Sequence, residues 1–297
     1  MGVAATKTTR LNRLRGPVAL VALCVVPVLL WVRAVRPEDR FAGTYASLTS
    51  LAVLLALAGT TAFGLNLVLG ARLPFVERLF GGLEGMYRVH RRTGEVAFAL
   101  LAGHVVLILA SRATISAASA LGLLAPGAGW TVFTGVLAFS AMTVSLLLTL
   151  FVRLGHELFV AVQRSFGFVF LLASYHVFKT PGAKESSTAL GAYLGVVATA
   201  GVAAFLYRSV LGSLLVRRRP YRVTAVNRLD DAVTEIVMEP LGRPLAFTPG
   251  QSVFVNFRSG AFSEALHPFE LSLRREVLSI RAGEARRQFH PFSITSA

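Results

Sequence analysis

The stretch YRVHRRTGEVAFALLAGHVV (residues 87–106) decides the fold. Most of it is apolar enough to lie inside a membrane, yet it holds two histidines, His90 and His104. Imidazole is costly in hydrocarbon, so a histidine in a membrane span indicates a functional site and needs a partner. On an α-helix these two histidines point to nearly the same side, about 21 Å apart along the axis. The rest of the chain must supply their partners.

The composition of the 297-residue chain is that of a membrane protein. Apolar residues make up 54 % and charged residues 15 %, and several apolar runs reach the roughly 20 residues needed to cross a bilayer. The single cysteine, Cys24, excludes a disulfide framework and a cysteine-rich metal cluster. The net charge of +15 does not indicate a nucleic-acid partner, because the basic residues lie at the ends of apolar runs, where they set membrane orientation.

Six apolar segments are predicted to span the membrane after a cytoplasmic tail of residues 1–16. They are residues 17–34, 46–70, 90–111, 130–152, 160–178 and 189–212. Arginine and lysine gather before the first segment, between the second and third, at the start of the fifth and after the sixth. This bias predicts a multi-pass protein of the cell membrane with both termini in the cytoplasm, and the lipid bilayer as its first partner.

The pattern changes near residue 216. The segments YRVTAVNRL (221–229), VTEIVME (233–239) and QSVFVNFRS (251–259) alternate apolar and polar residues and predict β-strands. The predicted fold class is therefore a mainly α membrane protein. A six-helix transmembrane bundle, residues 17–215, is followed by an incomplete antiparallel β-barrel domain, residues 216–297, which the chain leaves before the barrel closes.

A partner for His104 lies in the fifth apolar segment. His176 stands near the far end of that segment, which runs in the same direction as the third, so the two histidines fall at a matching depth. Two neutral imidazoles at one depth suit the axial positions of a b-type haem. The alternative is that each histidine bonds only to a neighbouring helix. Zinc fits less well, because it requires three or four clustered ligands.

Three features make the chain resemble the ferric reductase superfamily. They are His-x13-His on a third span, a fifth span ending in histidine, and HPFSITSA (residues 290–297) in a cytoplasmic β region. The superfamily includes bacterial ferric reductase-like membrane proteins, yeast ferric-chelate reductases and phagocyte-type NADPH oxidases. The resemblance implies that His90, His104 and His176 ligate haem iron. It also implies that electrons pass from NAD(P)H through FAD and haem across the membrane.

One position departs from the family pattern. The fifth span usually carries a second, inner histidine, and that place is taken by Gln163, whose amide is a poor iron ligand beside imidazole. His156 lies two helical turns nearer the cytoplasm. We therefore expect one haem b held by His104 and His176. A second, inner site would pair His90 with Gln163 or with His156, and its ligation would be incomplete.

Several arginines lie at the cytoplasmic end of the same two spans. Arg91 and Arg92, with Arg88 and Arg164 nearby, are candidates for pairing with haem propionates or flavin phosphates. The alternative is that they set orientation and extend to lipid headgroups.

The segments PGQSVFVNF (249–257) and HPFSITSA (290–297) resemble the flavin-binding barrel of the ferredoxin-reductase type. By that resemblance FAD would contact His290, Pro291, Phe292, Ser293, Thr295 and Ser296. An aromatic ring offers a stacking surface and hydroxyls bind phosphate. A second copy, HPFELS (267–272), carries Glu270, whose charge would lie beside the diphosphate. We therefore prefer the later copy. NAD(P)H would act through a region absent from this chain or through a separate reductase module.

These features predict a transmembrane oxidoreductase. Electrons would pass from cytoplasmic reduced FAD through haem b to an external acceptor, ferric iron or a ferric chelate. Protein groups would position and tune the cofactors rather than act as acid or base. A superoxide-generating enzyme of the NADPH-oxidase type is one alternative, with dioxygen as acceptor. A haem-bearing membrane anchor that delivers electrons to a partner protein is another, and a transporter without redox activity is the third.

Overall fold

The computed structural model describes residues 2–180, 187–211, 219–229, 234–245, 252–255 and 290–293. The chain divides into two units, Met1–Leu215 and Val216–Ala297. Each is described by itself.

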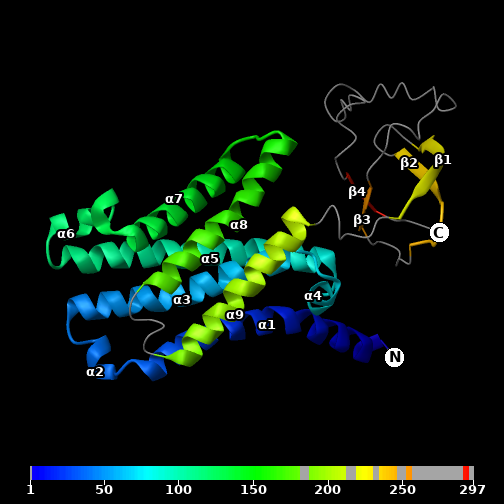
Figure 1. The fold of residues 1–297 in the computed structure, drawn as a ribbon. Coiled ribbons are helices and arrows are strands. Elements are labelled where there is room, and N and C mark those ends of the chain that lie inside the picture. Colours follow the sequence, from blue (N-terminus) through cyan, green and yellow to red (C-terminus); the bar gives the residue numbers. More distant parts are fainter. Residues whose placement is uncertain are drawn as a thin grey trace. The chain divides into compact units, whose positions relative to one another are not determined.

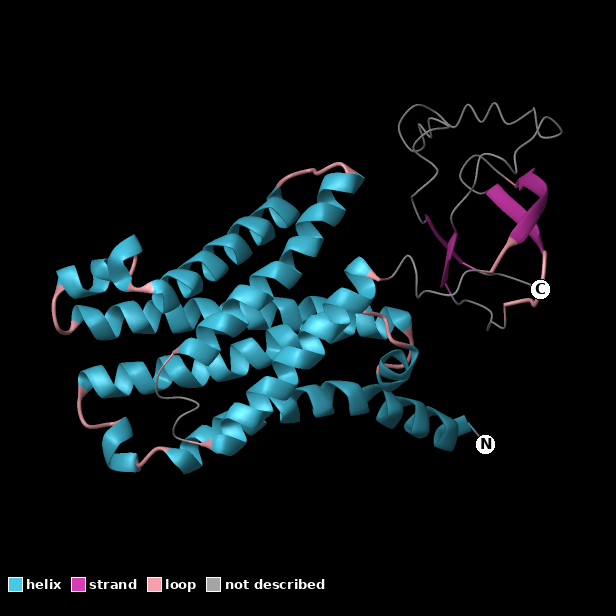
Figure 2. Cartoon of the chain, in the orientation of Figure 1, coloured by secondary structure: helices cyan, strands magenta, loops and turns pink. Residues whose placement is uncertain are grey.

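Six long helices make up the first unit (Figures 1 and 2). They are α1 (Gly2–Ala34), α3 (Thr44–Gly70), α5 (Leu83–Ala113), α7 (Trp130–Phe151), α8 (His156–Lys179) and α9 (Thr188–Phe205). Each contains a stretch long and apolar enough to cross a membrane, with mean hydropathy between 1.5 and 2.2. The prediction of a mainly α, six-span membrane protein is therefore confirmed.

Short helical elements connect the long helices. They are α2 (Pro37–Arg40), α4 (Pro74–Leu79), α6 (Ala117–Gly122), the 3-10 turn η1 (Pro126–Ala128) and the π turn η2 (Leu206–Val210). Three of them begin with proline, which suits the first helical position because its missing N–H would have no partner there. Figure 1 places α2 and α6 at one end of the bundle and α4 at the other.

Two helices begin earlier than hydropathy predicts. Helix α1 already starts at Gly2, within the predicted tail, and α5 starts at Leu83 rather than at residue 90. The added turns of α5 are charged, and an ion pair between Arg88 and Glu84, one turn apart at 2.9 Å, supports the helix there. The hydropathy pattern marks only where the apolar run begins. The helix itself starts earlier and includes the charged residues that precede this run.

Helix α3 lies at the centre of the bundle and packs on α5, α9 and α1, while α7 packs on α8. Small residues allow the closest approach. A Cβ added at Gly201 of α9 would lie 3.2 Å from the Cα of Gly64 on α3 and 2.6 Å from the ring of Phe170. Close backbone approach of this kind stabilises helix pairs in membranes, where apolar burial alone gives little driving force.

The second unit contains two antiparallel strand pairs. Strand β1 (Tyr221–Arg228) pairs with β2 (Thr234–Pro240), and β3 (Ser252–Val255) pairs with β4 (His290–Ser293). In the described part of this unit the strands form two separate two-stranded sheets and do not close into a barrel. The predicted incomplete antiparallel β structure after the helical bundle is thus confirmed.

Candidate functional site

Three histidines of the long helices, His90, His104 and His176, share one local geometry. Each ring places Nδ1 close to a backbone carbonyl of a neighbouring helix. The distances are 3.1 Å from His90 to Asn66 O, 3.0 Å from His104 to Ala52 O, and 2.8 Å from His176 to Thr131 O. A carbonyl oxygen only accepts hydrogen bonds, so Nδ1 carries the proton and donates it in all three cases.

This hydrogen bond fixes the tautomer of each neutral ring. With the proton on Nδ1, the lone pair of Nε2 remains unused and the ring cannot swing freely. Metal-ligating histidines are held in this way, because the bond to the second nitrogen orients the ring and raises its basicity. A histidine that merely bonded to a neighbouring helix would need Nδ1 alone. The observed bonds agree with that alternative as well, and they leave Nε2 of all three rings able to accept a further partner.

His104 and His176, on α5 and α8, are close enough to interact electrostatically. Both helices are described over their full length, and they do not pack along each other: α5 packs on α3, and α8 packs on α7. Two imidazoles on different helices are a donor set that a haem can use. We call Ala52, His104, Thr131 and His176 the His104 level.

Gly135 of α7 provides the space that the ring of His176 occupies. A Cβ at this position would lie 2.6 Å from Nδ1 and 2.7 Å from Cε1 of that ring. Any side chain here would displace the imidazole from its bond to Thr131 O. The donor set and this cradle both fit a haem with two imidazole ligands.

A second level lies toward the other end of the bundle, near α4. It consists of Asn66 on α3 and His90 on α5, and we call it the His90 level. The predicted partner Gln163, on α8, is exposed and is bonded to Thr149 on α7, so its pairing with His90 stays a prediction. Gln163 Nε2 donates to Thr149 Oγ1 at 3.1 Å, and Thr149 Oγ1 donates to Ser145 O at 2.8 Å. Because the hydroxyl proton is already used, Oγ1 must accept from the amide nitrogen. The amide oxygen of Gln163 is therefore left for another partner.

An apolar layer separates the two levels. Phe63 of α3 meets Phe170 edge-on at 5.2 Å, and Phe98 of α5 stacks on Phe139 of α7 at 6.0 Å with an interplanar angle of 7°. Phe170 is fully buried, whereas Phe168 is 62 % exposed. The layer belongs to the apolar core of the bundle.

The arginines predicted to bind cofactors are paired within their own helix. Arg91 and Arg92 both reach Glu95, each at 3.0 Å, and both side chains are highly exposed. Exposed ion pairs of this kind exchange partners readily. A role for Arg91 and Arg92 toward propionate or flavin phosphate stays a prediction.

Arg72, just after α3, lies near His90 and near a second arginine, Arg208. The guanidinium of Arg72 lies 5.0 Å from the ring centroid of Tyr87, and Arg72 interacts electrostatically with both Arg208 and His90. Burial lowers the pKa of Arg72, Tyr87 raises it and Arg208 lowers it. Sequence reasoning missed this cluster. Its signal is Arg208, a charged residue within the sixth apolar segment.

Asn66 was also missed, although it left a signal. It is the one asparagine between residues 46 and 70, and a polar side chain in a span indicates a functional role. Its carbonyl holds His90, and its side-chain Oδ1 is buried without a hydrogen-bond partner among the described residues.

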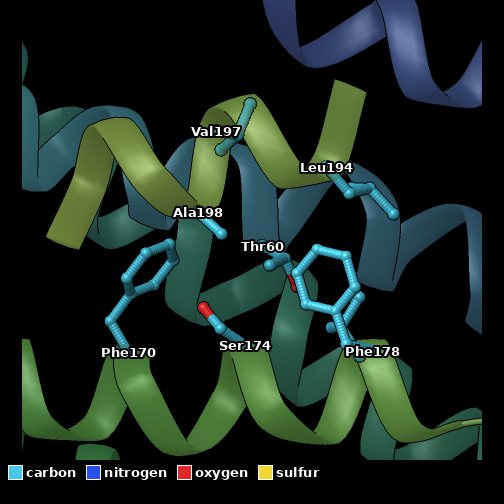
Figure 3. Close-up of a pocket in the computed structure, with 8 residues that line it drawn as sticks. Thr60, Phe170, Ser174, Phe178, Leu194, Val197 and Ala198 are labelled. Carbon is cyan, nitrogen blue, oxygen red and sulfur yellow. The ribbon is translucent and has the colours of Figure 1, made fainter. Parts of the chain in front are cut away.

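A small cavity lies between α3, α8 and α9 (Figure 3). The hydroxyls of Thr60 and Ser174 lie at this cavity among apolar side chains, and Ser174 Oγ has no partner in the described part of the chain. Its volume of about 10 Å³ matches one water molecule. It is far too small for a macrocycle and is not the cofactor site.

The flavin motifs are brought together in part. Strand pairing sets Val253 opposite Phe292 and Val255 opposite His290, so the two segments that resemble a flavin-binding barrel are neighbours. Pro291 and Ser293 lie on the same strand. Thr295 and Ser296 lie outside the described residues, as does the HPFELS copy at 267–272. The side chain of His156, the first residue of α8, is likewise outside the description.

One comparison with known proteins gives a match. Residues 55–174 match the family described as "Ferric reductase like transmembrane component". The match spans less than half of the chain, runs from α3 into α8, and ends two residues before His176. No curated protein matches the chain. Residues 55–174 are thus similar to a ferric reductase-like transmembrane domain, which suggests a multi-pass membrane oxidoreductase.

Proposed function

We propose that this protein is a transmembrane oxidoreductase in which haem b is held between His104 and His176. The observation that carries the proposal is the pair of Nδ1 bonds to carbonyls on α3 and α7, which orients both imidazoles and keeps Nε2 free for iron. The family match over residues 55–174 supports the same class. Haem bound there supplies a centre that gains and loses one electron at a time.

The protein's own residues position the ligands and exclude water. The carbonyls of Ala52 and Thr131 hold the two rings in the tautomer that iron requires. Gly135 leaves the space in which His176 sits. The phenylalanine layer below this level lowers the local polarity, which is a lever by which proteins set haem potential.

We further propose that FAD binds at the paired β3 and β4 strands and that NAD(P)H is its reductant. The external acceptor is a ferric chelate, reduced by one electron per iron. Arg112 and Lys179 close α5 and α8 at the end nearer His104, where positive charge would attract an anionic chelate. Dioxygen, reduced to superoxide, is the second candidate acceptor.

Absorption spectroscopy of the purified protein tests the haem proposal. We expect the dithionite-reduced protein to show the sharp bands of a low-spin b-type haem, and His104→Ala and His176→Ala each to lose them. Ser174→Ala is the matched control, because it lies on the same helix and its hydroxyl has no partner among the described residues. Unchanged bands in His176→Ala would refute the proposal.

Reduction of ferric citrate tests the acceptor. We expect the reduced wild type to form ferrous iron, trapped by a coloured chelator, and His176→Ala to lose this activity together with its spectrum. Superoxide formation at the same rate without ferric citrate would favour dioxygen instead.

Retention of added FAD, followed by fluorescence, tests the flavin site. We expect a Phe292→Ala variant to retain less of it than the wild type does.

A further inference from the structure

The connection between α5 and α7, residues 114–129, contains no charged residue. The uncharged stretch is longer still, since none of residues 113–152 is Asp, Glu, Lys or Arg. Each of the other connections between successive long helices contains at least one charge. The α1–α3 connection, at the same end of the bundle (Figure 1), contains Arg36, Glu38, Asp39 and Arg40. Charges are costly in hydrocarbon, so the composition of the α5–α7 connection is that of a segment lying in lipid.

The large apolar side chains of this connection point away from the protein. Ile115, Leu121, Leu124 and the first residue of α7, Trp130, are between 51 % and 68 % exposed. Single exposed apolar residues are ordinary, whereas a cluster of them marks a surface that contacts lipid or another protein. Tryptophan is also enriched at the boundary between lipid and water.

The backbone of the connection makes hydrogen bonds within the segment. Helical turns follow one another through α6 and η1, and Leu124 N donates to Leu121 O at 3.0 Å between them. At the start of α6, Ser116 Oγ accepts from Ser119 N at 3.0 Å. A segment in lipid has to satisfy its backbone groups internally, because no water is present to do so. The fold of the connection meets this demand at the groups named.

The connection adjoins two membrane spans. Helix α6 packs on α5, and η1 packs on α7. Both spans expose apolar side chains of their own, among them Val106 of α5 and Leu137 of α7. The bilayer that surrounds these spans is therefore the partner next to the connection, and its apolar interior matches the exposed side chains.

We propose that residues 114–130 are embedded in the lipid at this end of the bundle and anchor the start of α7 there. The exposed apolar side chains contact acyl chains, and the indole of Trp130 lies at the boundary with the headgroups. The next residue, Thr131, provides the carbonyl that holds His176. The anchor thus leads directly into the His104 level, although the inference itself requires no haem there.

Tryptophan fluorescence tests the inference, because the chain has only two tryptophans. Trp31 is 5 % exposed, and the Trp31→Phe variant leaves Trp130 as the one emitter. In vesicles of phosphatidylcholine with brominated acyl chains, we expect Trp130 to lose most of its emission and aqueous iodide to quench it little. Trp130→Phe, which keeps only the buried Trp31, is the control and should respond little to either quencher.

Two outcomes of this experiment would overturn the inference. Quenching by iodide at least as strong as quenching by the brominated lipid would place Trp130 in water. Protection from both quenchers would place it under a protein partner, such as a second copy of the chain. If Trp31→Phe does not fold, the difference between the wild type and Trp130→Phe gives the same quantity.

A matched pair of cysteine variants tests a second point of the connection. In a Cys24→Ala background, Leu121→Cys is compared with Phe41→Cys. The parent residues are 68 % and 57 % exposed and belong to the same end of the bundle, but only Phe41 adjoins charged residues. The orientation of the protein in vesicles therefore affects both variants equally. We expect a membrane-impermeant maleimide to label Phe41→Cys faster by about tenfold or more, because the reactive thiolate forms poorly in lipid. Equal labelling rates would refute the embedding of α6.

Discussion

Replacing Gly135 by alanine tests the site through a single methyl group. The new Cβ would lie 2.6 Å from His176 Nδ1, which is 0.8 Å inside the 3.4 Å at which ordinary contact begins. The ring cannot yield without losing its 2.8 Å bond to Thr131 O. The substitution therefore changes the position of the His176 ring. It leaves the chemical identity of both His104 and His176 unaltered.

Two opposing effects set the expected change in stability. Alanine in place of glycine favours a helix by about 1 kcal/mol. Overpacking costs about 1–3 kcal/mol if the ring stays, or about 1 kcal/mol if the ring turns away and its hydrogen bond breaks. The net change in the free energy of unfolding of the haem-free protein is then about 0–2 kcal/mol. If His176 holds haem as proposed, the same substitution should strongly reduce haem content, because the displaced ring would no longer be available to the iron.

The assay compares two glycine variants. Gly195→Ala on α9 is the matched control, since a Cβ there meets no atom within 4 Å, and it should be neutral or slightly stabilising. We expect Gly135→Ala to retain much less haem per chain than Gly195→Ala and to lose the low-spin bands. Equal haem content and identical spectra in the two variants would show that His176 does not depend on this space, and the reasoning would fail.

Three further predictions concern packing and charge. Phe170→Ala, at a fully buried site, should destabilise the protein by roughly 3 kcal/mol. Phe168→Ala should destabilise it little, because Phe168 is 62 % exposed. Thermal unfolding in detergent compares the two variants, and equal losses of stability would contradict the assigned burial. Glu95→Gln should change stability by less than about 1 kcal/mol because its ion pairs are exposed, and loss of flavin or haem in this variant would instead implicate the freed arginines. Tyr193→Phe removes the 2.6 Å hydrogen bond to Leu23 O that joins α9 to α1. It should lower the free energy of unfolding by about 1 kcal/mol. The same melting assay measures this, with Tyr175→Phe as the control.

The six spans were predictable because their signal is additive. Every residue of an apolar run contributes to it, and a bilayer demands roughly 20 of them. The boundaries of the helices were less predictable. Helix α5 begins at Leu83, because local ion pairs extend the helix beyond the apolar run. The pairing of His104 with His176 was inferred from their depth and from the common direction of the third and fifth spans, and it stays a prediction.

The supports of the site could not be read from the sequence. Every residue has a carbonyl, so only the helix register selects those of Ala52 and Thr131 as hydrogen-bond acceptors. Gly135 is one of 26 glycines, and its importance depends on which ring meets it across the α7–α8 contact. Side-chain identity predicts chemistry, whereas these supports depend on three-dimensional neighbours.

The departure at Gln163 has a physical explanation in the same register. Thr149 offers only a lone pair, because its proton is donated to Ser145 O. A lone pair suits the N–H of a glutamine amide as well as it suits the Nδ1–H of an imidazole. What changes between them is the atom presented to the other side, an amide oxygen in place of an imidazole nitrogen. Gln163 and His176 are thus each anchored by an acceptor on α7, and they present different atoms beyond that bond.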